Sequence, residues 1–499
     1  MSDILFTHSY FYKFDRKQWE TQQPYPPYGT IYAAALMRSL GFEVHLFDVA
    51  LKDSPSELAS ILVREKPRYL VIYDDGFNYL TKMCLTRMRE AAFDMAKMGK
   101  AHSCYVIVNS SDSTDHFEQY LKEGADFVIL GEGEQTLRAL IAALESGADD
   151  FSDIAGLAFL PKNSNKVLRT APRPVLHDLD ELPDPAWDLV NIAAYKDIWE
   201  RAHGTFSLNL ATTRGCPYKC NWCAKPIYGN RYNSRSPERV AAEIERLIEQ
   251  YGVRHFWMAD DIFGLKPGWV QRFHDVVQAK NLHFTYKIQS RVDLLLKEDT
   301  IDALAASGLK QVWVGAESGS QKILDAMDKG TTVEEIAEAT QLLKKKGIEV
   351  CFFLQFGYLG ETRADIDATL AMLKKLQPHD IGISVSYPLP GTKFYDKVKT
   401  LLGEKQNWEV SDDLAMMYPA TYSPDFYRRL HRLVHKQFRL QQGKTAWKNL
   451  LNDRPANLRR AVRTFYYAPA ALLDRWRLRR LERKNATPYG ASTTRPGGI

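Results

Sequence analysis

Residues 207–223 read SLNLATTRGCPYKCNWC, and this stretch decides how we interpret the larger part of the chain. Its first half, Ser207–Thr212, has the apolar composition of a buried β-strand. Directly behind it stand Cys216, Cys220 and Cys223, which are three of the six cysteines of the chain. Such crowding is typical of a metal or cluster site in a reducing compartment, because disulfide frameworks spread their cysteines along the chain.

Five more apolar segments follow this strand, and each is followed in turn by a helical pattern. The first of these helices has clear boundaries: Ser236 is a suitable N-cap, Pro237 fits the first helical position, and Gly252 follows the last apolar residue. Six such units in series predict a partial (β/α)6 barrel, with its site at the carboxyl ends of the strands. The other predicted strands are 256–261, 284–290, 311–317, 350–356 and 381–387.

The first 150 residues also alternate between short apolar strands and amphipathic helices. This alternation predicts a parallel sheet covered on both faces, which is a doubly wound, Rossmann-like domain. Ligands of such sheets bind beyond the carboxyl ends of the strands. The predicted strands are 4–8, 43–48, 69–73, 104–108 and 127–130, and the predicted helices lie near 31–40, 55–66, 80–98, 115–122 and 135–144.

These patterns divide the chain of 499 residues into four parts. We expect a Rossmann-like domain at 1–150, a linker rich in proline and acidic residues at 151–204, the partial barrel at 205–395, and a helical region with a basic tail at 396–499. The whole is therefore an α/β protein with a helical C-terminal region. We find no secretory signal and no apolar run long enough to span a membrane, so the cytoplasm is the expected location.

The positive charge of the chain is concentrated at its C-terminal end. Residues 454–499 contain eleven Lys and Arg against two acidic residues, a net charge of +9. Since the whole chain carries +5, the remainder is at −4, and we expect no DNA binding. A basic amphipathic helix in this tail could lie on an anionic membrane at the inner face, contact RNA, or simply pack on the barrel.

The cysteine spacing CxxxCxxC is suited to one kind of metal group more than to others. Three thiolates on a short loop can ligate three irons of a [4Fe–4S] cubane and leave the fourth iron open for a small molecule. A closed zinc site needs four protein ligands, and no fourth Cys or His follows at a usual spacing. His203 is nearby, but on the N-terminal side. A zinc or iron–sulfur protein without catalytic activity remains the alternative.

The cysteine triplet, with the aromatic Trp222 before the last cysteine, resembles the radical S-adenosylmethionine (SAM) superfamily over about residues 205–395. The resemblance implies that the fourth iron binds the amino and carboxylate groups of SAM. It also implies that reductive cleavage of SAM gives methionine and a 5′-deoxyadenosyl radical, which abstracts hydrogen from a substrate. An electron donor such as flavodoxin or ferredoxin is then required. No catalytic residue of the protein is indicated, because the cofactor carries the chemistry.

Further residues at the ends of the predicted strands resemble positions that contact SAM in this family. Asp260 and Asp261 stand where an acceptor for the SAM amino group is expected, although either could cap a helix. Ser290 and Arg291 end the third strand, and Arg291 could pair with the SAM carboxylate or with a surface acid. Glu317 ends the fourth strand and resembles the residue that contacts the SAM ribose, with helix capping as the alternative.

Three segments of the first domain resemble the cobalamin-binding domain found ahead of many radical SAM enzymes. They are PPYG at 26–29, GFEVHLFD at 41–48 and GEGE at 131–134. That subgroup includes radical methyltransferases and the anaerobic magnesium-protoporphyrin ester cyclase. Two features differ from its pattern: the DxHxxG motif is absent, and Asn109-Ser110 stand where relatives have Gly-Gly. A domain that no longer binds cobalamin is therefore the alternative.

Together these features predict a radical SAM enzyme with a [4Fe–4S] cluster that methylates or remodels an unactivated carbon with the help of cobalamin. A cobalamin-independent cyclase or rearrangement enzyme is the second hypothesis. A methylthiotransferase is disfavoured, because that family needs a second cysteine triplet and only Cys84 and Cys104 precede Cys216. We expect a small-molecule substrate of apolar character, such as an isoprenoid, a lipid or a tetrapyrrole.

Overall fold

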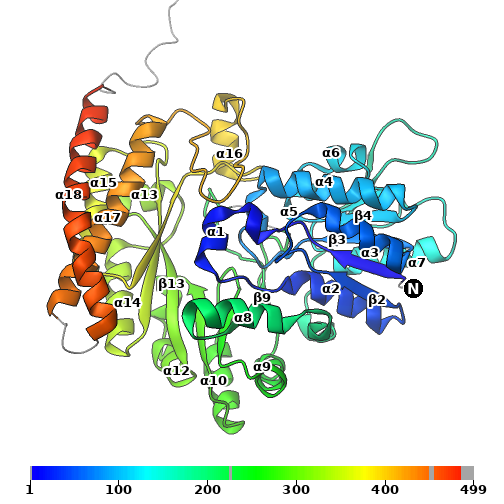
Figure 1. Ribbon diagram of the computed structural model, residues 1–499, viewed down its shortest axis with the longest axis horizontal. Helices are drawn as coiled ribbons and strands as arrows, with labels where there is room; N and C mark the ends of the chain where they lie inside the picture. The colour runs from blue at the N-terminus through cyan, green and yellow to red at the C-terminus, as the bar shows by residue number, and fades with distance from the viewer. Residues whose placement is uncertain (1–2, 224–226, 449–453, 485–499) are drawn as a thin grey trace, which may run out of the picture.

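The computed structural model describes residues 3–223, 227–448 and 454–484. Two sheets dominate it, one near the N-terminus and one in the middle of the chain (Figure 1). A pair of long C-terminal helices lies at the end of the molecule opposite the N-terminal sheet (Figure 1). This arrangement confirms the predicted fold class, a Rossmann-like domain followed by a partial barrel and a helical region.

The N-terminal sheet has seven strands in the order β2-β1-β3-β4-β5-β6-β7, and β1 to β5 pair in parallel. Helices α3 and α4 share one apolar core with the sheet, and α2 and α7 share another. Helices thus cover both faces, as in a doubly wound domain. The parallel strands are β1 (Ile4–Thr7), β2 (Val44–Phe47), β3 (Tyr69–Tyr73), β4 (Tyr105–Asn109) and β5 (Phe127–Ile129). The helices are α1 (Arg16–Thr21), α2 (Tyr28–Ser39), α3 (Leu58–Glu65), α4 (Thr86–Ala101), α5 (Ser111–Asp115), α6 (Phe117–Lys122) and α7 (Glu134–Glu145).

Two strands of this sheet come from the stretch that we interpreted as an irregular linker. Strands β6 (Leu157–Phe159) and β7 (Leu168–Arg169) extend the sheet in antiparallel fashion. Helix α8 (Ile192–His203) follows them. Strands of two or three residues are too short to show a periodic pattern, and they are stabilised only in the folded domain, where β6 pairs with β5 and β7 pairs with β6.

The second sheet has six strands in the order β15-β14-β13-β12-β11-β8, and all neighbours pair in parallel. It confirms the predicted partial barrel, with each strand within a few residues of its predicted position. The strands are β8 (Ser207–Leu210), β11 (His255–Met258), β12 (Thr285–Ser290), β13 (Leu309–Glu317), β14 (Glu349–Phe356) and β15 (Asp380–Val385). The helices between them are α9 (Pro237–Tyr251), α10 (Trp269–Ala279), α11 (Val292–Leu295), α12 (Thr300–Ala306), α13 (Gln321–Ala326), α14 (Val333–Lys345) and α15 (Arg363–Leu376).

Helix α9 forms as its sequence predicts. The Ser236 side chain accepts a hydrogen bond from the backbone N–H of Arg239, and Pro237 occupies the first turn. Gly252 ends the helix with a φ of +68°, a conformation that costs glycine little. These local signals require no tertiary contact, which explains why the sequence alone is sufficient to predict them.

A short antiparallel pair closes the segment that contains the cysteines. Strand β9 (Thr213–Arg214) pairs with β10 (Asn233–Ser234), so the described residues 215–223 and 227–232 belong to the loop that follows β8 and β9. At the base of this loop Gly215 has a φ of +79°, and a Cβ atom there would overlap the carbonyl oxygen of Arg231. Only glycine therefore fits this position without moving the backbone.

After the barrel the chain forms helix α16 (Lys393–Val398) and a long antiparallel helical pair, α17 (Pro424–Lys448) and α18 (Arg454–Lys484). Helix α17 packs against β15 and α15, and α18 packs against α17 (Figure 1). Within the described parts of the chain, no helix combines the length and the apolar character that crossing a membrane requires.

A buried polar network joins the N-terminal domain to the barrel. The Glu243 carboxylate of α9 accepts hydrogen bonds from Arg235 at 2.6 Å, from Tyr28 of α2 at 3.1 Å and from Trp187 at 3.0 Å. Because an unpaired charge is costly in such a place, the three donors hold α2 and α9 in one relative position. The carboxyl ends of the two sheets are fixed relative to each other in this way.

Candidate functional site

The three cysteine thiols lie on the loop between β9 and β10, at the carboxyl end of the first barrel strand. The pKa of the Cys223 thiol is raised to about 12, mainly by burial and in addition by the nearby charges of Asp261, Cys220 and Cys216. The three sulfur atoms are therefore close enough to interact electrostatically. The raised pKa means that the thiol form of Cys223 is favoured over the thiolate. A bound metal would favour the thiolate instead, because a cation deprotonates the thiols that coordinate it.

The thiols do not converge on a single point. Across the described ranges, no group of three or more His, Cys, Asp or Glu side chains surrounds one ion position. A cubane does not require such convergence, since each thiolate binds a different iron at a separate corner. The placement of the thiols is therefore compatible with a cluster.

Asp260 fixes the start of the cysteine loop. Its carboxylate accepts hydrogen bonds at 2.7 Å from the backbone N–H groups of Thr212 and Thr213 and from the Thr212 hydroxyl. The residue is only 1% exposed, and burial raises its pKa to about 6 although these hydrogen bonds lower it. Both oxygens are thus used within the protein, so Asp260 positions the loop in the structure as it stands.

Asp261 points elsewhere and forms an ion pair with Lys82, which lies in the segment between β3 and α4. The Asp261 carboxylate also lies near Cys223, whose pKa it raises. The Lys82 ammonium group thus lies beside the Asp261 carboxylate, next to the cysteine loop. The sequence indicated Asp261 but not Lys82, because the two residues are 179 positions apart.

Arg291 lies against the cysteine loop. Its guanidinium group stacks on the ring of Tyr218 at 3.7 Å, and its Nη1 atom is 3.8 Å from the sulfur of Cys220. Its Nε atom donates to Asp293 at 2.9 Å, which fixes the plane of the group. The preceding Ser290 donates its hydroxyl to the carbonyl of Phe263 at 3.1 Å, so it has a partner within the barrel.

Glu317 and Lys329 form a buried ion pair at the end of β13. The Lys329 Nζ atom donates to the carboxylate at 3.0 Å, and both side chains are less than a tenth exposed. Burial lowers the pKa of Lys329, but the charges of Glu317 and Cys220 outweigh burial, so the pKa lies above its ordinary value. The ammonium also lies 5.9 Å from the ring of Trp222, whose buried Nε1 atom has no partner among the described residues.

The backbone at Glu317 explains part of this geometry. Glu317 has a φ of +55°, and the pairing of β13 with β14 shifts register between Gly315 and Glu317. A Cβ atom at Gly315 would collide with the Lys329 ammonium and the Glu317 carboxylate, so glycine leaves room for the pair. An irregular strand end of this kind turns a side chain towards a site. No sequence pattern indicated Lys329, which follows the short helix α13.

The carboxyl edge of the N-terminal sheet has a different character. Asn109 at the end of β4 donates to the carbonyls of Ile129 and Gly131 at 3.1 and 3.0 Å. Several buried polar atoms in the segments after β4 and β5 have no hydrogen-bond partner within the described residues. They are Asn109 Oδ1, Ser111 Oγ, His116 Nε2, Glu134 Oε2 and Gln135 Oε1.

The glycines of this edge are approached by protein atoms. A Cβ atom at Gly133 would lie 2.7 Å from the Tyr73 ring and 2.9 Å from the Asn109 side chain, and one at Gly76 would lie 2.9 Å from the Tyr228 hydroxyl. In this structure these two glycines make room for side chains, two of which come from the same domain.

Arg214 connects this edge to the cysteine loop. It precedes Cys216 by two positions, is fully buried, and pairs with Glu134 at 2.7 Å and with Glu132. The ring of Tyr228, from the far side of the cysteine loop, covers the guanidinium at 4.9 Å. The acidic residues of the GEGE segment thus hold the base of the cysteine loop, a role that the sequence did not indicate.

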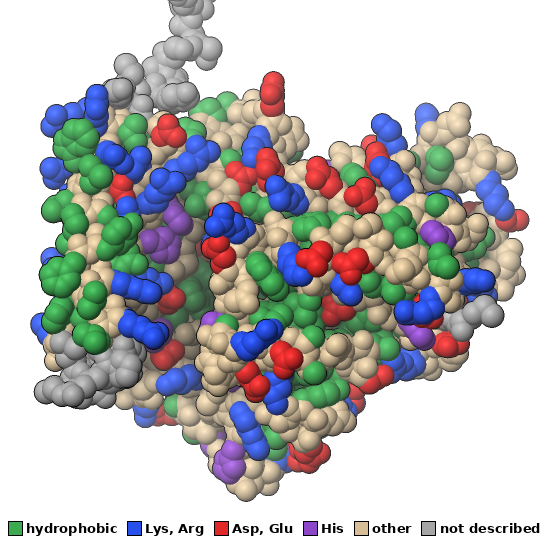
Figure 2. Space-filling model, viewed as in Figure 1, with side chains coloured by type: hydrophobic (Ala, Val, Ile, Leu, Met, Phe, Trp, Pro, Cys, Tyr) green, Lys and Arg blue, Asp and Glu red, His purple; other side chains and the backbone are tan. Residues whose placement is uncertain are grey.

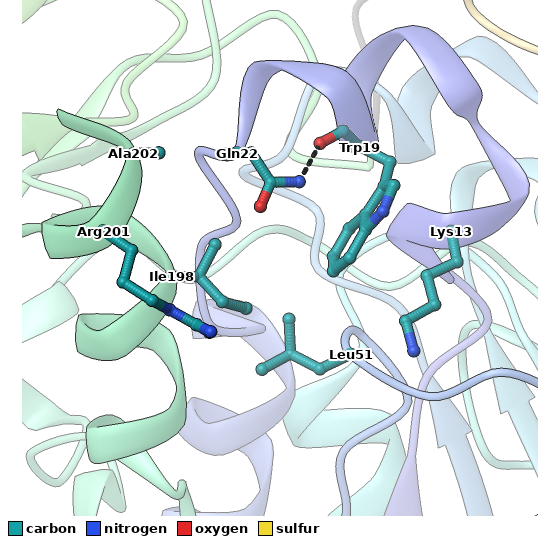
Figure 3. A pocket seen from close by; sticks show the side chains of 7 residues that line it. All are labelled: Lys13, Trp19, Gln22, Leu51, Ile198, Arg201 and Ala202. Atoms are coloured by element: carbon teal, nitrogen blue, oxygen red, sulfur yellow. Dashed lines mark hydrogen bonds between the residues drawn. The ribbon is translucent and has the colours of Figure 1, made fainter.

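A separate cavity of about 520 Å³ lies between α1 and α8 (Figure 3). Trp19 and Lys13 line one side and Arg201 the other, and the Gln22 amide donates to the Trp19 carbonyl. None of the candidate site residues lines this cavity. We therefore locate the site at the barrel edge.

A comparison with protein families matches residues 210–373 to the family described as the Radical SAM superfamily. An uncharacterized methyltransferase of Pyrococcus horikoshii is 29% identical over 74% of this chain and 78% of its own length. An anaerobic magnesium-protoporphyrin IX monomethyl ester cyclase of Rubrivivax gelatinosus is 28% identical over 77% of this chain and 69% of its own length.

Two solved structures share the fold. The cobalamin-dependent SAM radical enzyme OxsB, with aqua-cobalamin bound, aligns with a TM-score of 0.73 at 16% identity. The alignment covers 96% of this chain and 72% of OxsB. The radical SAM methyltransferase TsrM from Kitasatospora setae aligns with a TM-score of 0.66 at 18% identity, over 80% of this chain and 75% of TsrM.

Proposed function

We propose that this chain, which matches the Radical SAM superfamily over residues 210–373, is an enzyme that uses a [4Fe–4S] cluster on Cys216, Cys220 and Cys223 to methylate or remodel an unactivated carbon. The family match confirms the resemblance indicated by the cysteine loop. One observation carries the proposal: the loop lies at the carboxyl edge of the barrel, where side chains from several neighbouring strands gather around it.

The residues present fit a cluster with one open iron. Three thiolates supply three corners, and the Arg291 guanidinium beside Cys220 can donate to a thiolate sulfur and stabilise its charge. When bound, the cluster supplies the electron that cleaves SAM into methionine and a 5′-deoxyadenosyl radical. The protein then has to orient SAM and exclude water, which buried ion pairs at the rim favour.

We propose specific roles for the rim residues. Asp261 would accept a hydrogen bond from the SAM amino group, so the Lys82 ammonium would have to share or leave this carboxylate. Glu317, oriented by Lys329, would contact the ribose, and Arg291 and Ser290 would border the SAM carboxylate. Trp222 would offer its unpartnered N–H, and Asp260 would keep the loop closed.

Cobalamin is the second cofactor that we propose, at the carboxyl edge of the N-terminal sheet. The five unpartnered buried polar atoms after β4 and β5 fit a ligand whose rim carries many hydrogen-bonding groups, as a corrin does. When bound, cobalamin would supply the methyl group for transfer. The similarity to a methyltransferase of P. horikoshii and to the fold of OxsB supports this assignment.

A cobalamin-independent cyclase or rearrangement enzyme is the second candidate, and one observation favours it. Tyr228 and the Arg214 pairs with Glu132 and Glu134 occupy space between the N-terminal sheet and the cysteine loop. If these contacts persist in the loaded enzyme, they leave less room for a corrin. Corrinoid analysis of the purified protein separates the two candidates.

The enzyme acts on a small molecule and takes an electron from a donor protein, as radical SAM enzymes do. We propose that the substrate is apolar, within the classes of tetrapyrroles, isoprenoids or lipids. The similarity to the magnesium-protoporphyrin cyclase of R. gelatinosus supports a tetrapyrrole. We also propose that the basic C-terminal tail contacts the inner membrane surface, where such substrates partition.

The test is anaerobic purification followed by analysis of iron, sulfide and corrinoid. Incubation with SAM and dithionite should release 5′-deoxyadenosine from the wild type but not from a variant with Cys216, Cys220 and Cys223 all replaced by Ala. Cys351→Ala, a buried cysteine within β14, is the matched control and should retain activity. Tight zinc without iron, or wild-type protein with a full cluster that leaves SAM intact, would refute the proposal.

A further inference from the structure

The outer face of the C-terminal helical pair is unusually apolar for a protein surface. Of the sixteen exposed large hydrophobic side chains among the described residues, eight lie between 447 and 476. Phe465 is 73% exposed, Tyr466 66% and Leu472 65%, so these side chains have no cover. Exposed apolar side chains that gather in one place mark an interaction surface.

Most of these side chains form one stripe along α18. Leu458, Val462, Phe465, Leu472 and Trp476 recur at intervals of three, four or seven residues, which places them on one side of the helix. In the space-filling view, apolar side chains and Lys and Arg side chains alternate along the left edge of the molecule, where α18 lies (Figure 2). We call this set, together with the adjacent exposed Tyr466, the α18 stripe.

The charges around the stripe are of one sign. Helix α18 contains only two acidic residues, and both form ion pairs with neighbouring elements. Asp474 is 2% exposed and pairs with Arg429 at 2.8 Å and Lys436 at 2.5 Å, and Glu482 pairs with Arg363 at 2.8 Å. Eight arginines of the helix remain exposed: 459, 460, 463, 475, 477, 479, 480 and 483.

A groove of about 810 Å³ lies between α15, α17 and α18, next to the α18 stripe. Its apolar lining includes Leu370, Leu373, Leu433, Val434 and Phe438. Its cationic lining consists of Arg363, Lys374, Lys444, Lys448, Arg475 and Arg479, against one acid, Asp367, which pairs with Arg363. Among the described residues, Lys374, Lys444, Arg475 and Arg479 form no ion pair, so their charges are available to a ligand.

We infer that this groove binds an anionic phospholipid of the membrane to which the α18 stripe attaches, an inference that rests on the membrane contact proposed above. An acyl chain would lie along the apolar lining, and its phosphate would meet the unpaired cations of the groove. The stripe would enter the interface of the bilayer, with the arginines at the level of the headgroups. A second copy of the chain is disfavoured as the occupant, since two equally cationic faces repel each other.

The membrane contact is tested with the reconstituted full-length enzyme and sedimented vesicles. We expect it to bind vesicles of phosphatidylcholine with phosphatidylglycerol at least about tenfold more than vesicles of phosphatidylcholine alone. Replacement of Phe465, Tyr466 and Trp476 by Ser should abolish this binding. Replacement of Tyr105 and Leu160 by Ser, two exposed residues of the other domain, should not. Equal binding to both kinds of vesicle overturns the preference for anionic lipid, and unchanged binding of the stripe variant overturns the membrane contact.

The groove is tested separately with monomeric dihexanoylphosphatidylglycerol and titration calorimetry, which requires no vesicle. A Lys444→Gln, Arg475→Gln variant should bind this lipid about tenfold more weakly, because two charge-assisted contacts are lost. An Arg459→Gln, Arg477→Gln variant removes the same charge outside the groove and should bind within about twofold of the wild type. Equal affinities of the two variants refute the groove even if vesicle binding persists. Wild-type binding of inorganic phosphate as tight as that of the lipid also refutes it, because the apolar lining would then be irrelevant.

A partner protein is the competing occupant of the stripe. Light scattering after size exclusion, without lipid, should give a mass independent of the stripe substitutions. A dimer that the Phe465, Tyr466 and Trp476 substitutions dissociate would assign the stripe to a second copy and overturn the lipid inference.

Discussion

The carboxyl edges of the two parallel sheets have the same kind of backbone, but they satisfy their polar side chains differently. At the barrel edge, Glu317 pairs with Lys329, Asp261 with Lys82, and Asp260 with the backbone of the cysteine loop. At the N-terminal edge, five buried polar atoms of the described residues have no partner. The acidic side chains of the barrel edge are thus held by protein partners, although Thr213 Oγ1 and Trp222 Nε1 there lack a hydrogen-bond partner within the described ranges. The N-terminal edge has more hydrogen-bonding capacity that a ligand can satisfy.

The barrel edge should be disrupted most by a change at the base of the cysteine loop. In Gly215→Ala the new Cβ would overlap the Arg231 carbonyl, so β9 and β10 could not close the loop. We expect the reconstituted variant to bind at most about a tenth of the wild-type iron. Gly229→Ala is the control in the same loop, because Gly229 has a φ of +69° but nothing within 4 Å of an added Cβ. Equal iron content in the two variants would contradict this account.

The next largest effect should come from breaking a buried pair at the barrel edge. Lys329→Met leaves the Glu317 carboxylate buried without its cation and should lower the free energy of unfolding by about 3–5 kcal/mol. Lys322→Met breaks a pair with Asp365 whose lysine is 55% exposed, and should cost about 1 kcal/mol or less. Urea unfolding of the apoprotein measures both. Similar losses in the two variants would mean that the Glu317 pair is not organising the edge.

The raised pKa of Asp260 predicts that the free energy of unfolding depends on pH. Its pKa is about 6 in the fold and near its ordinary value of 3.8 in the unfolded chain, so the folded state binds the proton more tightly. The contribution of Asp260 to stability should therefore be greatest below pH 4 and should fall by about 3 kcal/mol in total as the pH rises past 6. Asp260→Asn cannot ionise, so the slope of its unfolding free energy between pH 4 and 6 should be less negative than that of the wild type. Parallel slopes would assign the titration to other groups.

The N-terminal edge gives the smallest expected effect. Hydroxocobalamin at a hundredfold excess over its Kd should raise the free energy of unfolding by about 2.7 kcal/mol. An Asn109→Leu, Ser111→Ala variant should lose most of this gain, since it removes two of the five unpartnered groups. Thermal unfolding with and without the corrinoid measures it. No stabilisation of the wild type would favour the cobalamin-independent candidate.

The neighbours Asp260 and Asp261 illustrate the limit of prediction at the site. Both stand at the end of the same strand, and the sequence offered both as contacts for SAM. In the structure one carboxylate is directed to the loop backbone and the other to a lysine of the first domain. Two adjacent side chains leave the end of a strand in different directions, so their roles depend on what each direction meets.

The sequence by itself determined the positions of the parallel strands, the ends of α9 and the cysteine loop. These depend on local periodicity, capping residues and close spacing, all of which act within one or two turns of the chain. Only the tertiary structure decided that Lys82, Lys329 and Arg214 complete the site, and that α18 exposes its apolar side. Lys82 and Asp261 are separated by 179 residues, and a contact at that distance exists only once both sheets have packed. Which side of α18 remains uncovered likewise depends on the neighbouring element that packs against its other side.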